Sequence, residues 1–131
     1  MVKGKNDINI LLFVESRYKI NRKRIKNTIT SLLQKQGIQT AEISIAFVGD
    51  RKMKDLNKKY RGLDKTTNVL SFSLTEGENF AETSDFLRLG DVVVSYPQVI
   101  REAAKEEVLV DDKIDELVSH GVLHLLGIHH D

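Results

Sequence analysis

Three of the four histidines in the chain have the spacing expected of metal ligands. His120, His124 and His130 follow the pattern H-x-x-x-H-x-x-G-x-x-H, with Gly127 as its glycine. Histidines four residues apart lie on one face of a helix, and a glycine that follows can end the helix and return the chain toward that face. The spacing therefore predicts a metal site of three histidines, in which His129 competes with His130 as the third ligand.

The ligand types indicate which metal and which chemistry to expect. The chain contains no cysteine, so a transition metal must be held by nitrogen and oxygen atoms. Zn²⁺ at catalytic sites commonly has three protein ligands and a water molecule whose pKa it lowers, and it can also polarise a phosphoryl oxygen. In zinc metalloproteases, a glutamate after the first histidine is the general base, whereas this chain has Gly121 there. A metalloprotease is therefore less favoured than another metal-dependent enzyme. A site in which the imidazoles only form hydrogen bonds, without a metal, is also less favoured.

A helix near the C-terminal end must position these histidines. Asp111 or Asp112 is predicted to cap it, and His120 and His124 fall at the edge of its apolar stripe. The residues of this stripe, which should face the core, are Ile114, Leu117, Val118, Gly121, Val122 and Leu125.

The preceding residues predict alternating strands and helices. Apolar runs and period-2 alternation predict strands at residues 8–14, 43–47, 69–74 and 89–94. Three more helices are predicted, with Asn21, Asp50 and Ser95 as their capping residues.

The connections between these elements differ in character. The segment from Arg61 to Asn68 lacks periodicity and predicts a functional or connecting loop, and residues 75–88 predict a hairpin-like connection. No domain linker or internal repeat interrupts the order, so residues 1–131 are expected to form one domain.

Charge is distributed unevenly along the chain. Residues 1–65 contain 16 Lys and Arg against 6 Asp and Glu, whereas residues 66–131 contain 4 against 13. The cations cluster at residues 17–26 and 51–65. A polyanion such as RNA is one explanation, and pairing of the basic and acidic halves is the other. No apolar run is long enough to span a membrane, and no signal peptide is recognised, so a cytoplasmic protein is expected.

Three blocks of sequence resemble the YbeY family of metal-dependent endoribonucleases, bacterial proteins of ribosomal RNA maturation. Residues 120–130 are similar to the family signature H-G-x-L-H-L-x-G-Y-D-H. Residues 56–72 are similar to L-N-x-x-Y-R-x-x-D-x-x-T-D-V-L-S-F, and residues 89–95 to L-G-D-I-V-I-S. The chain departs from these patterns at Asn68, Ile128 and His129, which replace aspartate, tyrosine and aspartate.

The resemblance implies a fold and a function. The fold would be an α+β domain with a mostly parallel four-stranded sheet, one antiparallel strand, four to five helices and a zincin-like metal site. The function would be single-strand-selective cleavage of RNA during maturation of small-subunit ribosomal RNA and ribosome quality control. The implied partners are ribosomal RNA and the small ribosomal subunit or its assembly factors. An RNA- or ribosome-binding assembly factor with a mainly structural metal is the alternative.

The resemblance also assigns roles to individual residues. His120, His124 and His130 would hold the metal, most simply Zn²⁺, and His120 and Arg61 would be catalytic. Arg61 would also contact RNA, and the basic cluster at residues 51–65 adds Lys58 and Lys59 as candidate RNA contacts. A guanidinium is suited to a phosphate whose charge grows in the transition state. An ordinary ion pair with Asp64 or another acid is the alternative role for Arg61.

Overall fold

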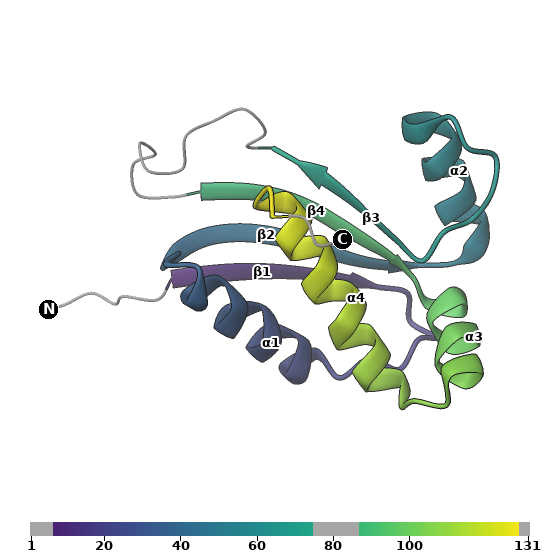
Figure 1. The fold of residues 1–131 in the computed structure, drawn as a ribbon, viewed down its shortest axis with the longest axis horizontal. Helices are drawn as coiled ribbons and strands as arrows, with labels where there is room; N and C mark the ends of the chain where they lie inside the picture. The colour runs from purple at the N-terminus through teal and green to yellow at the C-terminus, as the bar shows by residue number, and fades with distance from the viewer. Residues whose placement is uncertain (1–6, 75–86, 129–131) are drawn as a thin grey trace, which may run out of the picture.

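Four strands form one sheet in the order β1-β2-β4-β3 in the computed structural model, which describes residues 7–74 and 87–128 (Figure 1). Strands β1 (Asp7–Val14), β2 (Thr40–Val48) and β4 (Leu87–Ser95) run parallel. Strand β3 (Val69–Ser73) pairs antiparallel with β4 and lies at the edge of the sheet. The expected mostly parallel sheet with one antiparallel strand is confirmed.

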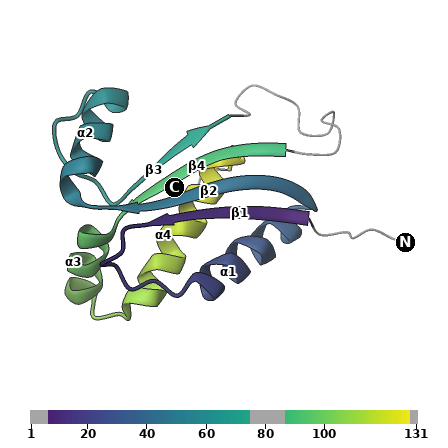
Figure 2. The same ribbon diagram turned by 180° about the vertical axis from the view of Figure 1, so that it is seen from behind.

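Helices α1 (Arg22–Lys35) and α4 (Val110–Leu125) cover one face of the sheet, which lies in front of them when seen from behind (Figure 2). Alternation along β2 produces this face, because Ile43, Ile45 and Phe47 are buried toward the helices. The apolar stripe of α4 packs here as predicted, with Ile114, Leu117, Val118, Val122 and Leu125 in the core. Helix α3 (Tyr96–Glu106) follows β4 directly and packs against α4. None of the helices described is long and apolar enough to cross a membrane.

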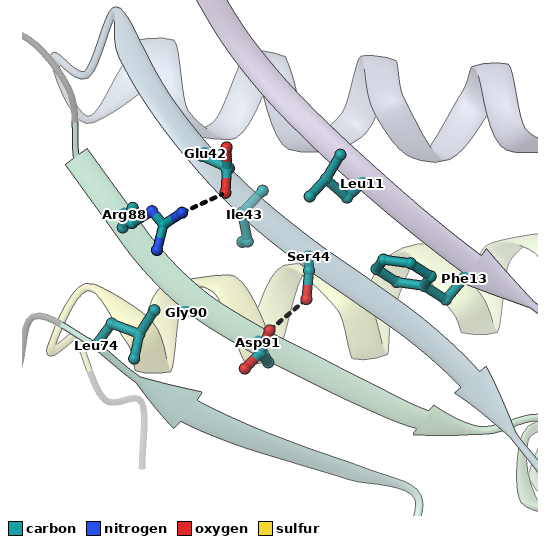
Figure 3. A pocket seen from close by; sticks show the side chains of 9 residues that line it. All are labelled: Leu11, Phe13, Glu42, Ile43, Ser44, Leu74, Arg88, Gly90 and Asp91. Atoms are coloured by element: carbon teal, nitrogen blue, oxygen red, sulfur yellow. Dashed lines mark hydrogen bonds and ion pairs between the residues drawn. The ribbon is translucent and has the colours of Figure 1, made fainter.

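Helix α2 (Asp50–Arg61) covers only part of the opposite face. Met53 packs there with Leu70 and Val93 in a second, smaller core. The remainder of this face carries a hollow of about 260 Å³ that includes the exposed side chains of Leu11 and Phe13 (Figure 3). Arg88 pairs with Glu42 at 3.7 Å, and the hydroxyl of Ser44 donates a hydrogen bond to Asp91.

A bulge interrupts β4 near its beginning. Arg88 is opposite Glu42 on β2, but Ile43 is opposite Gly90, so Leu89 is an extra residue. Gly90 has φ +136°, and a Cβ atom there would lie 2.1 Å from the carbonyl oxygen of Phe72. Only glycine fits this position, because both the backbone conformation and the approach of β3 exclude a side chain.

The predicted helix starts are partly confirmed. Asn21 accepts a hydrogen bond from the amide of Arg24, and Ser95 accepts one from the amide of Gln98, so both cap their helices as expected. Asp50 does not cap α2, because Gly49 is the N-cap residue and the Asp50 carboxylate instead bonds to side chains outside the helix.

The predicted cap of α4 is wrong as well. Leu109 is the N-cap residue, and the amide of Lys113 donates to its carbonyl. Asp111 and Asp112 therefore lie in the first helical turn, where a carboxylate interacts favourably with the helix dipole. Arg24 of α1 pairs with Asp112, so tertiary contacts determine the role of this carboxylate.

Candidate active site

One surface pocket brings together predicted site residues from distant parts of the sequence. It has a volume of about 150 Å³ and lies where the end of α2, the edge strand β3 and the last turns of α4 meet. Its lining consists of Arg61, Val69, Ser71, His120, Gly121, His124 and Leu125. The fold therefore brings Arg61, His120 and His124 to the lining of one cavity, and the roles assigned to them stay predictions.

His120 and His124 lie one turn apart on α4, and their rings face each other. The ring centroids are 5.7 Å apart, the planes differ by 25°, and both residues are exposed. Both rings therefore lie on the face of α4 that lines the pocket, as two ligands of one ion must. Residues 7–74 and 87–128 contain no group of three potential ligands around one point. His129 and His130 lie outside the described residues, so the third ligand stays a prediction.

Helix α4 contacts the sheet at Gly121, the residue that follows His120. A Cβ atom at this position would lie 2.7 Å from Cγ1 of Val92 and 3.1 Å from the hydroxyl of Ser71. Helix α4 thus approaches β3 and β4 at a distance that only glycine permits. A glutamate at position 121, which would be the general base of a zinc metalloprotease, has no room here. This agrees with the interpretation that the protein is not a metalloprotease of that type.

Arg61 is the last residue of α2. Gly62 follows it in the left-handed conformation, with φ 72°, and its amide donates to the carbonyl of Lys58 to end the helix. The side chain of Arg61 is exposed and makes no ion pair within the described part of the chain. Asp64, the expected partner in the alternative role, pairs with Lys54 at 3.8 Å instead.

The loop after Arg61 is anchored by buried and half-buried polar groups. The side-chain amide of Asn57, which is buried, donates to the carbonyl of Lys65 at 2.8 Å. Asp50 accepts hydrogen bonds from Thr66, Ser95 and Arg101. The hydrogen bond from Arg101, with smaller contributions from Ser95 and Thr66, lowers the pKa of Asp50 against the opposing effect of burial.

Asn68 anchors the end of the same loop. Its backbone carbonyl accepts from the amide of Ser95 at 2.9 Å, and its side chain donates to Glu102 at 3.1 Å. Burial raises the pKa of Glu102, but hydrogen bonds from Gln98, Asn68 and Lys113 outweigh it, so the pKa is lowered. An aspartate at position 68, as in the resembled pattern, would face the Glu102 carboxylate with a like charge. The asparagine therefore matches its surroundings in this chain.

Lys113 completes this arrangement between α3 and α4. The side chain is buried, and its ammonium lies 2.9 Å from Glu106, 3.3 Å from Glu116 and 3.7 Å from Glu102. Burial lowers the pKa of Lys113, but hydrogen bonds to Glu106 and Glu116 outweigh it and raise the pKa. Sequence reasoning did not identify this lysine, because it interrupts the apolar pattern of α4 with a charge.

The two basic clusters have different surroundings. In the first, Arg24 donates to Asp115 at 2.8 Å and to Asp112 at 2.6 Å, so at this residue the basic and acidic halves do pair. In the second, Lys54 is the only cation with an ion pair among residues that the structure describes. Lys58 and Lys59 are exposed on the same helix as Arg61. Charge pairing therefore explains part of the first cluster and little of the second.

The fold and the pocket are those of a small α+β enzyme domain whose ionisable side chains converge at a sheet edge. The family model of endoribonuclease YbeY matches residues 12–131. Endoribonuclease YbeY of Syntrophus aciditrophicus is 37% identical over 117 residues, which cover 89% of this chain and 72% of that protein. The Desulforamulus reducens protein of the same name is 39% identical over 124 residues, which cover 93% of this chain and 74% of the relative. The chain belongs to the YbeY endoribonuclease family.

A solved structure is similar in fold. The solution structure of a Thermotoga maritima protein matches with a TM-score of 0.61 and 26% sequence identity, over 95% of this chain and 75% of that one. The fold of this chain therefore resembles that of a protein whose structure has been solved.

Proposed function

We propose that this protein is a metal-dependent endoribonuclease that cuts single-stranded RNA. The observation that carries the proposal is the pocket that joins Arg61 of α2 to His120 and His124 of α4, in a chain that belongs to an endoribonuclease family. The proposed substrate is ribosomal RNA, during maturation of the small-subunit RNA and ribosome quality control. The small ribosomal subunit or its assembly factors would be the partners, in the cytoplasm.

The donors in the pocket fit one divalent ion, and Zn²⁺ is the simplest choice. His120 and His124 supply two imidazole ligands from adjacent turns of α4, and the sequence pattern assigns the third to His130. When bound, the ion supplies a Lewis acid that polarises a phosphoryl oxygen.

The residues of the chain itself position and stabilise the phosphate. Arg61 lines the pocket, and in this proposal its guanidinium stabilises the negative charge that grows on the phosphate in the transition state. His120 lines the same pocket as Arg61, which supports a role for it next to a phosphate bound there. Lys58 and Lys59 neutralise neighbouring phosphates on the same RNA strand.

The alternative is an RNA- or ribosome-binding assembly factor with a structural metal. Structural zinc sites are commonly closed by four protein ligands. Here His120 and His124 are both exposed at a surface pocket, which favours a site that admits substrate.

The test is a cleavage assay on the purified full chain, with its metal content measured in the same preparation. We expect a single-stranded RNA to be cut at internal bonds, a duplex of the same sequence to be spared, and a chelator to stop cleavage until Zn²⁺ or another divalent ion is returned. A metal-loaded protein that binds RNA without cutting it would instead support the assembly factor.

A further inference from the structure

An exposed aromatic side chain lies next to Arg61. Tyr60 is on the last turn of α2, and 54% of its surface is exposed. Its ring packs against Phe72 of β3 in an edge-to-face arrangement, with centroids 5.1 Å apart and planes at 64°. Phe72 is itself packed against the small core under α2. The tyrosine ring is therefore supported from the protein side while much of its surface faces solvent.

The position of Tyr60 relates it directly to the candidate active site. Arg61, the next residue, lines the pocket, as does Ser71, which precedes Phe72 on β3. Neighbouring side chains on a strand point to opposite faces, and β3 is an edge strand. The aromatic pair and the histidines therefore flank the two sides of one exposed strand. A nucleic acid chain that passes over this edge with one phosphate at Arg61 would bring a neighbouring nucleotide to Tyr60.

The charges around Tyr60 identify the kind of ligand. The ammonium of Lys59 lies 5.1 Å from the centroid of the tyrosine ring, and Lys58 and Arg61 are exposed on the same end of the helix. An exposed aromatic ring on a cationic surface is a combination by which proteins hold single-stranded nucleic acid, because bases stack on the ring while cations follow the backbone. A cationic surface of this kind would repel a basic protein partner.

We infer that Tyr60 is a stacking site for an unpaired base of the RNA substrate and contributes to the preference for single strands. The inference rests on the proposed function. A base in a duplex is already stacked between its neighbours and cannot place its face on Tyr60, so this contact is open only to an unpaired base. Phe72 holds the ring in place, and Lys59 and Arg61 contact the phosphates on either side.

The test compares variants of Tyr60 in RNA binding by the full chain. Binding of a labelled single-stranded oligoribonucleotide and of its duplex is measured by fluorescence anisotropy. We expect Tyr60→Ala to weaken single-strand binding by about five- to a hundredfold, the scale for losing one stacked base. Duplex binding should change less than single-strand binding. Tyr60→Phe and Tyr60→Trp should keep the affinity, because both retain an aromatic face.

Two controls separate stacking from other effects. Tyr60→Leu keeps an apolar contact with Phe72 but has no aromatic face, so it should bind RNA as weakly as the alanine variant while remaining folded. Phe13→Ala removes an aromatic side chain of similar exposure, 58%, from β1, and should leave RNA binding unchanged. The salt dependence should stay the same in Tyr60→Ala, since no charge is lost.

The outcomes distinguish this inference from the proposed function. A wild-type protein that binds and cuts single-stranded RNA, with Tyr60→Leu equal to it in affinity, would overturn the stacking site alone. A Tyr60→Phe variant as weak as Tyr60→Ala would also overturn it, because the hydroxyl and not the ring would then matter. A wild-type protein that binds RNA without cutting it would overturn the nuclease proposal, while the ranking of the Tyr60 variants would still decide the stacking site.

Discussion

The hydroxyl of Ser71 donates a hydrogen bond to the backbone carbonyl of Gly121, at a distance of 3.1 Å. The bond joins the edge strand β3 to the turn of α4 that begins at His120. Both residues line the same pocket, so the position of the histidine pair relative to Arg61 depends on this close contact between helix and sheet.

Gly121→Ala should destabilise the fold. Alanine is normally preferred to glycine inside a helix by about 1 kcal/mol, but here its Cβ would lie 2.7 Å from the stiff side chain of Val92. Overpacking of this kind costs about 1–3 kcal/mol, so we expect a net loss in the free energy of unfolding, measured by urea denaturation. Adding Val92→Ala should recover part of the loss. Ser119→Ala on the same helix is the control, and an equal effect there would contradict the contact.

The third metal ligand can be identified by comparing two adjacent histidines. His130→Ala should lose most of the bound metal, because three imidazoles hold the ion more tightly than two, whereas His129→Ala should retain it. Metal content per chain, measured by elemental analysis after exposure to Zn²⁺, gives the answer. The reverse ranking would assign the ligand to His129, and equal retention in both variants would mean that either histidine can serve.

Arg61→Ala should reduce RNA cleavage by about ten- to a thousandfold, the scale for losing one preorganised charge. Folding and metal content should be nearly unchanged, because Arg61 is exposed and makes no ion pair among the described residues. Arg61→Lys should restore cleavage only partly, since an ammonium lacks the planar fork of donors. Arg51→Ala, at the other end of α2, is the matched control. Full activity of a folded, metal-loaded Arg61→Ala protein would falsify the catalytic role.

RNA binding should weaken steeply as salt is added, because phosphate neutralisation releases counterions. Lys58→Ala and Lys59→Ala should each lower the slope of log affinity against log salt by about one. Arg24→Ala should leave the slope unchanged and reduce stability, because Arg24 pairs with Asp112 and Asp115. Affinity that is flat between low and moderate salt would reject the α2 surface as an RNA contact.

Asp50→Asn should reduce the dependence of stability on acid. The pKa of Asp50 is lowered in the folded protein, mainly by the hydrogen bond from Arg101. The stabilisation is therefore present above the ordinary aspartate pKa of 3.8 and lost as the pH falls from there through the folded pKa. The melting temperature of Asp50→Asn should be lower than wild type at pH 6, and the difference should shrink at pH 3. A difference that stays constant would show that charge plays no part.

Much of the fold can be predicted from local patterns. Alternation marks the buried face of β2, and the runs of Ile and Val mark the parallel strands. Asn21 and Ser95 cap helices as expected, because their hydrogen bonds are made within a few residues. Asp50 and Asp112 depart from prediction because their carboxylates bond to Arg101 and Arg24, which lie far away in the sequence.

The residues of the candidate site could be predicted from the sequence, but the contacts that hold them in position could not. The spacing of His120 and His124 fixes a shared helix face, and the sequence block around Arg61 identifies the arginine. The bond between Ser71 and Gly121 and the contact of Gly121 with Val92 depend on how α4 crosses the sheet. The sequence pattern of a single helix or strand does not predict how α4 crosses the sheet. Tyr60 was present in the matched block, but only its exposure distinguishes it from a core aromatic.

Chemical labelling of the buried ammonium of Lys113 can be used to measure how often helices α3 and α4 separate. Reagents that acylate lysine attack the neutral amine at the surface, and among the described lysines only Lys113 is buried, with 4% of its surface exposed. Its raised pKa further reduces the neutral fraction. The other described lysines will react in the native state, whereas modification of Lys113 requires α3 and α4 to separate. The rate at which this one amine is labelled therefore measures how often the α3–α4 interface opens.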